Sequence, residues 1–499
     1  MNKEEQATGR SLNELLAIRR EKLQAIREMN FRAYEYEFQK THSAAEITQN
    51  FDELTEKVVV RVAGRLMAIR KMGRASFGHI QDESGRIQIY VQENSVGQQG
   101  YKLFNLLDIG DIIGITGRVF RTHTGEITIL VEELQLLAKN LRPIPIVKEK
   151  DGQIFDAFSD KEQRYRQRYL DLMVNPEVRE VFKTRSKIIQ WTRDFLNEHG
   201  FLEVDTPILQ PIYGGANARP FKTYYNALER EFYLRIAVEL YLKRLIIGGF
   251  EKVYEIGKNF RNEGLDRSHN PEFTLLEFYQ TYVDYNYMMD FVEQYFHYLC
   301  SKLGESKFPF GEYEIDFSQP FSRRKMFELI HEYVGEDITQ YSEAELKSLC
   351  LKKNLELKPG DNYGKYIELL FSNFVEPHLI QPTYVIDYPK AISPLAKNKR
   401  DGSPNLVERF ELYIAGHEFV NAFSELNDPI DQRERLEQQN RLRESGDEEA
   451  QTMDEDFVTA LEYGMPPTGG VGIGIDRVVM LFTNQVSIKD VILFPQMRT

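Results

Sequence analysis

Residues 254–279 read YEIGKNFRNEGLDRSHNPEFTLLEFY, and this stretch decides the fold of the chain. Two runs rich in aromatic and branched apolar residues flank a polar centre with Gly, Asn, Asp and Ser, a pattern that predicts two strands joined by a loop. Arg261 and Glu263 come before the loop, and His269 and Phe273 follow it. Because the arginine fork binds carboxylate and phosphate groups bidentately, this segment is suited to an anionic substrate.

Two further segments pair an apolar run with charged groups. Residues 469–482, GGVGIGIDRVVMLF, predict an alternating Gly/apolar strand that delivers Arg477 at the start of a helix. Residues 188–209, IIQWTRDFLNEHGFLEVDTPIL, predict an amphipathic helix that passes through Gly200 into a strand ending at Pro207. The sequence has no GxxxxGK[ST], and GGVGIGIDR does not satisfy GxGxxG, so any ATP is held in some other way.

The three segments, in chain order, resemble motifs 1, 2 and 3 of the class II aminoacyl-tRNA synthetases. The resemblance is closest to the lysine-specific members and extends over essentially the whole chain. FRNE followed by HNPEF is its most specific part, GIGIDR is strong in combination, and residues 188–209 alone are a weak signal. The resemblance implies ATP-dependent activation of L-lysine to lysyl-adenylate with release of pyrophosphate, then transfer of lysine to the 3′ end of tRNA(Lys).

Composition sets limits on the class of protein. At 499 residues two or three domains are expected, and no apolar run approaches the roughly 18 residues that span a bilayer, so no membrane partner is expected. The first residues, MNKEEQATGRS, lack the apolar segment of a secretory signal, which predicts a cytoplasmic protein. The formal charge of −14 argues against binding nucleic acid through bulk charge. With only Cys300 and Cys350, neither a disulfide framework nor a multi-thiolate zinc site is expected.

The predicted fold is α+β. Ser11 and Glu14 form a capping-box pattern before a helix over residues 12–29. Short alternating runs from Val58 to about Leu137, with a helical patch between the third and fourth, predict a five-stranded OB-fold barrel. The predicted divisions are an N-terminal helical segment (1–57), the OB-fold anticodon-binding domain (58–140), a linker (141–160) and the class II catalytic domain (161–499). The last is expected to hold a mixed, mainly antiparallel sheet flanked by helices, with a helical insertion at about 281–380.

The predicted barrel has a face suited to nucleic acid. Phe77 and Phe120 are candidates for stacking bases, although either aromatic is as readily explained as core. Arg70, Lys71, Arg74 and Arg121 are candidates for phosphate contacts. The resemblance implies anticodon reading, with Phe77 stacking on a base and Gln88 and Glu126 bonding to uridine edges.

The two arginines answer a requirement of the chemistry. Adenylation joins two anions, a carboxylate and the α-phosphate, so the site must neutralise charge and align the partners in line. The resemblance implies that Arg261 bridges the lysine carboxylate and the α-phosphate, and that Arg477 covers the adenine and reaches the γ-phosphate. It further implies catalytic roles for both arginines, with Glu263, His269, Phe273 and Asn421 completing the ATP site.

Magnesium needs only one or two carboxylates besides phosphate oxygens. In residues 409–428, RFELYIAGHEFVNAFSELND, Glu411 and Glu418 are seven apart, which places them on opposite faces of a continuous strand. A turn near Ala415 and Gly416 would restore a common direction. The resemblance assigns Mg²⁺ to these two glutamates.

A pocket selecting lysine needs carboxylate and hydroxyl acceptors, because a desolvated ammonium must be compensated. Glu425 and Tyr279 are the candidates for the ε-ammonium. The resemblance implies that Glu425 pairs with the ε-ammonium, that Tyr279 hydrogen-bonds to it and that Phe423 packs against the aliphatic stem. It also assigns the α-ammonium to Glu239, Glu277 and the backbone at Gly215, and the carboxylate to Arg261 and Asn421.

Three positions depart from the expected pattern. Val238 stands where proline is expected, Ala422 stands where glycine is common, and Ser268 replaces an arginine before His269, with Arg267 as a neighbouring substitute. These departures bear on the triphosphate contacts rather than on the reaction.

Three alternatives remain open at this point. A non-catalytic OB-fold protein would be expected to lose the motif arginines or the acidic residues, and all are present. A lysine ligase acting on a protein would lack the barrel, and an aspartate- or asparagine-specific relative would need cations in place of Glu425 and Glu239. The resemblance also implies a homodimer formed through the region of residues 177–199.

Overall fold

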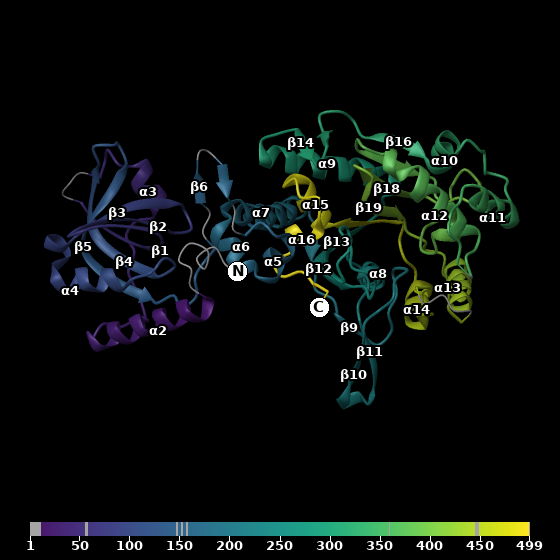
Figure 1. Ribbon diagram of the computed structural model, residues 1–499. Helices are drawn as coiled ribbons and strands as arrows, with labels where there is room; N and C mark the ends of the chain where they lie inside the picture. The colour runs from purple at the N-terminus through teal and green to yellow at the C-terminus, as the bar shows by residue number, and fades with distance from the viewer. Residues whose placement is uncertain are drawn as a thin grey trace. The chain divides into compact units, whose positions relative to one another are not determined.

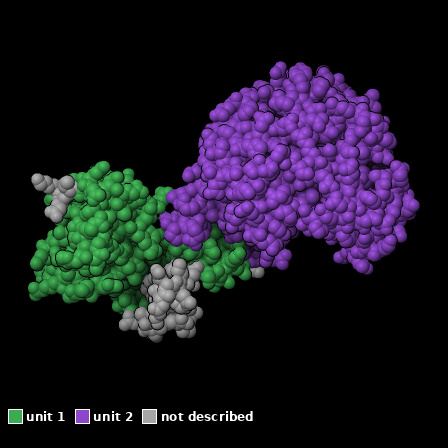
Figure 2. All heavy atoms as spheres, turned by 90° about the horizontal axis from the view of Figure 1, so that it is seen from above, with its two compact units in different colours: residues 1–175 green, residues 176–499 purple. Residues whose placement is uncertain are grey.

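The computed structural model describes residues 11–54, 58–145, 148–150, 153–155, 158–358, 360–444 and 449–498. The chain divides into two compact units, residues 1–175 and 176–499, which Figure 2 colours green and purple. Each unit has its own strands and its own apolar core, as Figure 1 shows for the elements labelled there. Among the described residues, no helix is long and apolar enough to cross a bilayer.

The first unit begins with a capped helix, as the sequence predicts. Helix α2 spans Leu12–Glu28, and the side chains of Ser11 and Glu14 close a capping box at its start. Helix α3 (Ala44–Gln49) begins with a second capping box, formed by Ser43 and Glu46. Leu23 and Ile26 of α2 join the apolar core of the barrel, so the N-terminal segment packs as part of this unit.

A five-stranded barrel follows, which confirms the predicted OB-fold. The strands pair in the order β1-β2-β3-β5-β4 and close through the β1–β4 pair. Helix α4 (Glu93–Leu106) lies between the third and fourth strands, as the sequence predicts. The strand bounds are β1 Val59–Met72, β2 Ala75–Gln81, β3 Arg86–Gln92, β4 Ile112–Arg121 and β5 Ile127–Ala138.

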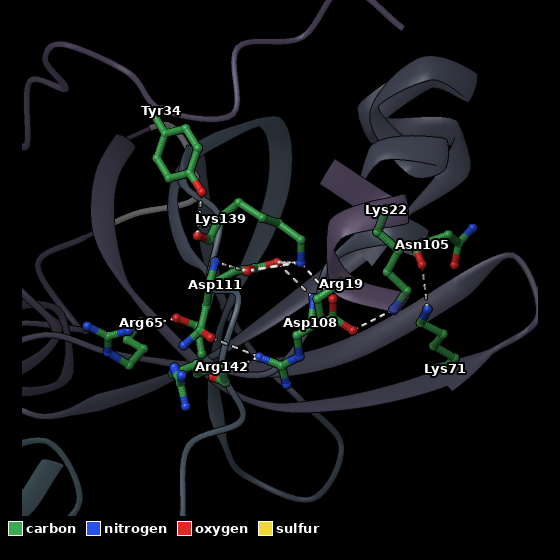
Figure 3. A network of polar contacts seen from close by, with 12 residues as sticks. Arg19, Lys22, Tyr34, Arg65, Lys71, Asn105, Asp108, Asp111, Lys139 and Arg142 are labelled. Atoms are coloured by element: carbon green, nitrogen blue, oxygen red, sulfur yellow. Dashed lines mark hydrogen bonds and ion pairs between the residues drawn. The ribbon is translucent and has the colours of Figure 1, made fainter. Parts of the chain in front are cut away.

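A buried ion network connects α2 to the barrel (Figure 3). The fully buried Lys139 ammonium contacts Asp108 at 2.6 Å and Asp111 at 2.8 Å. Lys22 of α2 reaches the other oxygen of Asp108 at 2.5 Å, and Arg19 donates to the Asn140 side chain at 2.9 Å. Burial raises the pKa of Asp111, whereas Asp108, although partly buried, has a lowered pKa because two lysines face it. The network therefore depends on Lys139 to compensate two buried carboxylates.

The segment predicted as a linker falls partly outside the described residues, which omit 146–147, 151–152 and 156–157. The strands β6 (Lys148–Lys150) and β7 (Gln153–Phe155) pair within it. Two short helices then lead to the second unit, namely α5 (Lys161–Arg166) and α6 (Arg168–Val174).

An eight-stranded sheet organises the second unit. Its order is β16-β17-β18-β19-β20-β13-β12-β8, and only the β16–β17 and β12–β8 pairs at its two edges are parallel. It is therefore the mixed, mainly antiparallel sheet that was predicted. The bounds are β8 Leu202–Glu203, β12 Lys252–Phe260, β13 Glu272–Thr281, β16 Ser322–Lys325, β17 Thr383–Ile386, β18 Arg409–Ile414, β19 His417–Ser424 and β20 Thr468–Gly474.

Helices cover both faces of this sheet. On one face α7 (Pro176–Glu198), α9 (Tyr285–Leu303), α15 (Ile475–Phe482) and α16 (Ile488–Val491) pack against alternate strand residues such as Leu276 and Phe278. On the other face α8 (Glu239–Ile247), α13 (Pro429–Glu444) and α14 (Glu455–Glu462) form a smaller core with Val253 and Tyr279. Glu277, between Leu276 and Phe278 on β13, thus faces the opposite side, where the functional residues lie.

The range 281–380 has two parts. Helix α9 and strand β16 belong to the main sheet and its core. The helices α10 (Met326–Val334), α11 (Glu343–Lys352) and α12 (Tyr363–Phe374) form a separate core with Val385 and Tyr413 (green in Figure 1). The remaining short elements there are β14 (Lys307–Phe310), β15 (Tyr313–Asp316), the 3-10 turn η2 (Glu376–His378) and, beyond the range, η3 (Lys390–Ile392).

The helix predicted before Gly200 is α7, and Gly200 follows it with a φ of +80°. The strand after it is shorter than the predicted run to Pro207, because only Leu202 and Glu203 pair with β12. Beyond them, Thr206 bonds instead to the side chain of Glu255 at 2.7 Å. A three-stranded sheet follows, made of β9 (Leu209–Gln210), β10 (Lys222–Tyr225) and β11 (Arg230–Leu234), with the turn η1 (Asn226–Leu228) between β10 and β11.

Candidate active site

One cavity of about 400 Å³ lies on the sheet face opposite α9, bounded by strands β13, β18, β19 and β20, by the loop between β12 and β13 and by the start of α15. Its size is that of a small-ligand site. The structure brings together here every residue that the sequence assigned to ATP, lysine or metal: Gly215, Glu239, Arg261, Glu263, His269, Phe273, Glu277, Tyr279, Glu411, Glu418, Asn421, Phe423, Glu425 and Arg477.

Arg261 follows directly after β12 at the base of the predicted loop. Its guanidinium lies over the Phe273 ring, 5.1 Å from the ring centre, and its Nε has no hydrogen-bond partner. Burial lowers the pKa of Arg261, although Glu263, Glu418 and Glu277 oppose that shift. A buried guanidinium with unused hydrogen-bonding capacity is available to an anion entering the cavity.

Arg477 lies in the first turn of α15, as predicted. Its guanidinium donates to the backbone carbonyl of Glu418 and lies 3.7 Å from the carboxylate of the same residue. The preceding residue, Asp476, fixes the helix, because its carboxylate accepts from the Thr274 backbone N–H at 2.7 Å and pairs with Arg185 of α7 at 2.6 Å. The position of Arg477 is therefore set by contacts with both β13 and α7.

The loop between β12 and β13 is held by an aspartate. Asp266 accepts from the backbone N–H groups of Ser268 and His269 at 2.6 and 2.7 Å, and its second oxygen contacts His269 Nδ1 at 2.8 Å. Both Glu263 and His269 are exposed, at the open side of the cavity. Ser268 also lines the cavity, whereas Arg267 is not among its lining residues in the described part of the chain.

Glu411 and Glu418 face the same side, as the predicted turn requires. Strands β18 and β19 form a hairpin whose turn residues, Ala415 and Gly416, both have positive φ angles of 52° and 75°. A bulge pairs Tyr413 with Glu418 while Leu412 pairs with Val420, which leaves Phe419 as the extra residue. The bulge explains how Glu418 and Asn421, three residues apart, share one face of a strand.

The two glutamates have different surroundings. Glu411 is buried and accepts from Arg409 at 2.5 Å, and from the hydroxyls of Tyr388 and Tyr413 at 2.8 and 2.6 Å. Among the described residues Glu418 has no such set of donors, with Arg477 3.7 Å away, and burial together with Glu411 raises its pKa. Glu376 lies near both, and burial, Glu411 and Glu418 raise its pKa to about 7. The described residues hold no cluster of three or more His, Cys, Asp or Glu side chains arranged as a metal site.

Acidic residues gather at the other end of the cavity. Glu239, Glu277 and Glu425 are all buried, and Tyr279 donates to Glu277 at 3.0 Å. Burial and the neighbouring Glu239 raise the pKa of Glu277 to about 8. The cavity thus has arginines at one end and a group of buried carboxylates at the other, which suits a ligand with an anionic and a cationic end.

The barrel carries a second group of predicted residues. Phe77 of β2 stacks on Tyr90 of β3 with ring centres 4.5 Å apart, and Phe120 lies 6.2 Å from Tyr90. Beside them, Gln88 donates to Glu126 at 2.6 Å, and His79 contacts the other oxygen of Glu126 at 2.9 Å. This face combines partly exposed aromatic rings with amide, imidazole and carboxylate groups, the means by which proteins read unstacked bases.

Three of the four basic residues predicted to contact phosphates have contacts within the barrel unit. Lys71 donates to the Asn105 carbonyl at 2.9 Å, Arg74 lies 3.7 Å from Glu93, and Arg121 lies over the Phe51 ring at 4.7 Å. Arg70 and Arg74 are exposed at the end of β1 and in the following turn.

Comparisons with known proteins agree with this geometry. Residues 160–498 match the family described as tRNA synthetases class II (D, K and N), and residues 60–137 match the OB-fold nucleic acid binding domain. The lysine–tRNA ligase of Pelotomaculum thermopropionicum is 54% identical over 99% of this chain and 97% of its own length. The enzymes of the same name from Carboxydothermus hydrogenoformans and Porphyromonas gingivalis are 53% and 51% identical, each over 98% of this chain and over 98% and 86% of their own lengths.

The chain belongs to the class II lysyl-tRNA synthetase family. This confirms the family resemblance, the α+β fold with an OB-fold barrel, and the class II catalytic architecture. The family match begins at residue 160, whereas the boundary between the compact units lies after residue 175. The two positions differ because α5 and α6 belong to the first compact unit.

The structure places all three departures from the expected family pattern. Val238 is buried at the start of α8, and its backbone N–H bonds to Glu277 and lowers the pKa of that carboxyl, a contact that proline could not make. Ala422 is buried on the α9 side of β19, in the core. Ser268 faces the cavity in the loop, where the family's arginine is missing.

The sequence interpretation missed several residues that shape this synthetase site. Lys243 pairs with Glu239 and Glu425, Arg409 donates to Asn421 at 3.0 Å and to Glu411, and Gln451 accepts from the Gly215 N–H at 3.2 Å. A local signal existed for Lys243 alone, since it lies four residues after Glu239 in one helix. The other contacts join segments far apart in the sequence and leave no local pattern.

Proposed function

We propose that this chain performs both steps of the lysine–tRNA ligase reaction that its family implies, with the cavity activating lysine and the barrel binding tRNA(Lys). In the first step a lysine carboxylate oxygen attacks the α-phosphorus of ATP, and the bond to pyrophosphate breaks. In the second, the 3′-terminal hydroxyl of tRNA attacks the lysyl carbonyl, and AMP leaves. The observation that carries the proposal is the presence of two partly buried arginines and a group of buried carboxylates in one cavity.

For ATP, the proposal gives Arg261 the bond-forming position. A cation between the attacking carboxylate and the α-phosphate stabilises the charge that develops in the transition state. The Arg261–Phe273 stack supports a neighbouring place for adenine on the Phe273 ring, with Arg477 on the other side of the nucleotide. Glu263, His269 and Asn421 complete the site at the adenine edge, the triphosphate and the substrate carboxylate.

For magnesium, the proposal uses Glu411 and Glu418. Two carboxylates with phosphate oxygens satisfy the hard-ligand requirement. The pKa values of Glu418 and Glu376 are raised first by burial and then by repulsion from the neighbouring glutamates, which a cation would relieve. A bound Mg²⁺ would supply positive charge to the triphosphate. Arg409, Tyr388 and Tyr413 hold the Glu411 carboxylate in place for this role.

For the amino acid, the carboxylates select lysine. Glu425 and Tyr279 are proposed to accept the ε-ammonium, Phe423 to pack against the aliphatic stem, and Glu239 and Glu277 to bind the α-ammonium. An aspartate side chain would meet carboxylates instead of cations here, at a cost of several kcal/mol for like charges in a buried site.

For tRNA, the proposal assigns anticodon reading to the aromatic face of the barrel. Phe77 would stack on one base, and Gln88 and Glu126, already bonded to each other, would exchange that contact for uridine edges. Tyr90 and His79, in contact with these residues, complete the face.

A homodimer and a cytoplasmic location complete the proposal. Several apolar side chains of the second unit are 41–57% exposed on or next to β8, β9 and β10, which suits a surface covered by a second copy: Leu202, Ile208, Leu209, Ile212, Tyr224, Tyr225 and Leu228. Sedimentation at micromolar concentration is expected to give a particle of twice 58.4 kDa. A monomeric particle across that range would rule the dimer out.

The test of the proposed function is ATP–pyrophosphate exchange without tRNA. L-lysine is expected to stimulate exchange above all other amino acids, and Glu425→Gln is expected to remove lysine selection while ATP binding remains. Stimulation by aspartate equal to or above that by lysine would end the lysine assignment.

A further inference from the structure

A lysine of the chain itself lies among the carboxylates of the proposed lysine pocket. The Lys243 side chain is fully buried in α8, and its ammonium lies 2.5 Å from Glu239 and forms an ion pair with Glu425. The aromatic rings of Phe423 and Phe457 lie 5.5 and 6.0 Å from the ammonium. These two carboxylates are the ones proposed to bind the two ammonium groups of the substrate.

Glu425 depends on this lysine more than Glu239 does. Within the described ranges Lys243 is the one cation paired with Glu425, and no other group hydrogen-bonds to either oxygen of that carboxylate. The other ionisable groups facing this pocket are Glu277 and Tyr279 of β13 and Arg409 of β18, and Arg409 is paired with Glu411. A buried carboxylate with a single partner keeps its charge and position only through that partner.

The charges of the pocket can be counted. Glu239, Glu277 and Glu425 contribute three negative charges when ionised, and Lys243 contributes one positive charge, which leaves two negative charges. Lysine brings two ammonium groups. The fixed cation of Lys243 therefore matches the pocket to a ligand with two positive charges at this end.

We propose that Lys243 is a positioning residue for lysine selection, which holds Glu239 and Glu425 ionised and in place so that they receive the two ammonium groups of the substrate. The inference rests on the proposed function of the cavity. Burial alone would lower the pKa of Lys243, but Glu239 and Glu425 raise it, so its charge persists at neutral pH. For the same reason Lys243 opposes the rise in the pKa of Glu425 that burial causes.

The matched control is Lys139 of the first unit. It is as fully buried as Lys243 and also pairs with two carboxylates, Asp108 and Asp111, but these lie in the barrel network of Figure 3. A purely structural role would make the two lysines equivalent: loss of either would lower stability without a selective effect on lysine.

The experiment measures KM and kcat for lysine and for ATP in the exchange reaction with Lys243→Met and Lys139→Met. Both variants are expected to have a lower Tm. Only Lys243→Met is expected to raise the KM for lysine, by about 100-fold, because it leaves buried carboxylates without their counter-ion. The KM for ATP is expected to stay within about threefold of the wild-type value, since the arginine end is intact. If Lys243→Met does not fold, Lys243→Gln is measured in the same way.

The pH dependence separates charge from packing. Without Lys243 the carboxylates take up protons more readily, so the ratio of the variant's KM for lysine to the wild-type KM at the same pH is expected to fall as pH rises from about 6.5 to about 8.5. A KM for lysine within threefold of wild type, or a rise independent of pH and shared by ATP, would overturn the inference. Wild-type protein without lysine-stimulated exchange would instead overturn the proposed function itself.

Discussion

At the scale of single residues, the proposed lysine pocket leaves no room for a side chain at Gly470. A Cβ placed there would lie 2.0 Å from Glu425 Oε1 and 2.4 Å from Tyr279 Cε1. Neither side chain is free to move, since both are buried. Gly470→Ala is therefore expected to raise the KM for lysine by about 10- to 100-fold, the kinetic equivalent of a 1–3 kcal/mol overpacking cost.

The neighbouring glycine provides the control. A Cβ on Gly469 would meet Met288, a flexible side chain on the other side of the strand, at 2.8 Å. Gly469→Ala is expected to change the KM for lysine by less than about threefold, because the added methyl group would meet Met288 of α9 and not the residues of the lysine pocket. Equal effects of the two substitutions would show that Gly470 matters for the strand and not for the pocket.

Glu277 makes lysine binding depend on pH. Its pKa is raised to about 8, mainly by burial and then by Glu239, so in the empty pocket it is largely protonated below that pH. Binding an ammonium requires the ionised form. The KM for lysine is therefore expected to fall as pH rises from 6 to 8, by up to about tenfold per unit, and to level off near pH 8.

Exchange assays across this pH range test the assignment. The KM for ATP, which depends on groups at the other end of the cavity, serves as the internal control. Glu277→Gln cannot titrate and is expected to bind lysine weakly with a flatter pH profile. An unchanged slope in that variant would assign the pH dependence to another group.

At the scale of elements, the position of α15 is fixed by contacts with α7. Arg185 pairs with the buried Asp476 at 2.6 Å and donates to Thr274 at 3.0 Å, and Arg477 follows in the same turn of α15. Arg185→Met leaves Asp476 buried without its cation, at an expected cost of about 3–5 kcal/mol in unfolding free energy. The displaced α15 is expected to raise the KM for ATP by about tenfold, with a smaller effect on lysine.

Arg193, on the same helix, is the control: it is an arginine paired with Glu203 and not with α15. It pairs with Glu203 at 3.0 Å, but both side chains are more than a third exposed. Arg193→Met is expected to cost less than about 1 kcal/mol and to leave both KM values unchanged. Denaturant unfolding followed by the fluorescence of Trp191, the single tryptophan, reports on this unit directly.

The features that were predicted correctly from the sequence are those that depend on residues close together in the chain. The capping box of Ser11, the strand period around Phe273 and the turn at Gly416 each depend on neighbours in the chain, and the structure has all three. Contacts between distant segments were not predictable. Lys243 reads as one basic residue of an amphipathic helix, and its partner Glu425 lies 182 positions later. The strand expected up to Pro207 ends at Glu203, because Thr206 finds a side-chain partner in Glu255.

At the scale of the whole molecule, the proposed function divides the reaction between the two compact units. The cavity and all its lining residues belong to residues 176–499, and the aromatic face belongs to residues 1–175. Phe77→Ala removes the ring stacked on Tyr90 and is expected to raise the KM for tRNA(Lys) in aminoacylation by about 10- to 100-fold, since stacking contributes about 1–3 kcal/mol per base. Lysine-dependent exchange without tRNA is expected to be unchanged.

Two comparisons make that expectation specific. Tyr36→Ala removes a ring of the same unit that is 91% exposed and lies outside the aromatic face, and it is expected to leave charging unaffected. Unaltered Trp191 fluorescence in both variants would show that the catalytic unit is intact. If Phe77→Ala reduced exchange as much as charging, the separation of anticodon binding from activation would be wrong, because a ring in the barrel would then be required by a reaction in which no tRNA takes part.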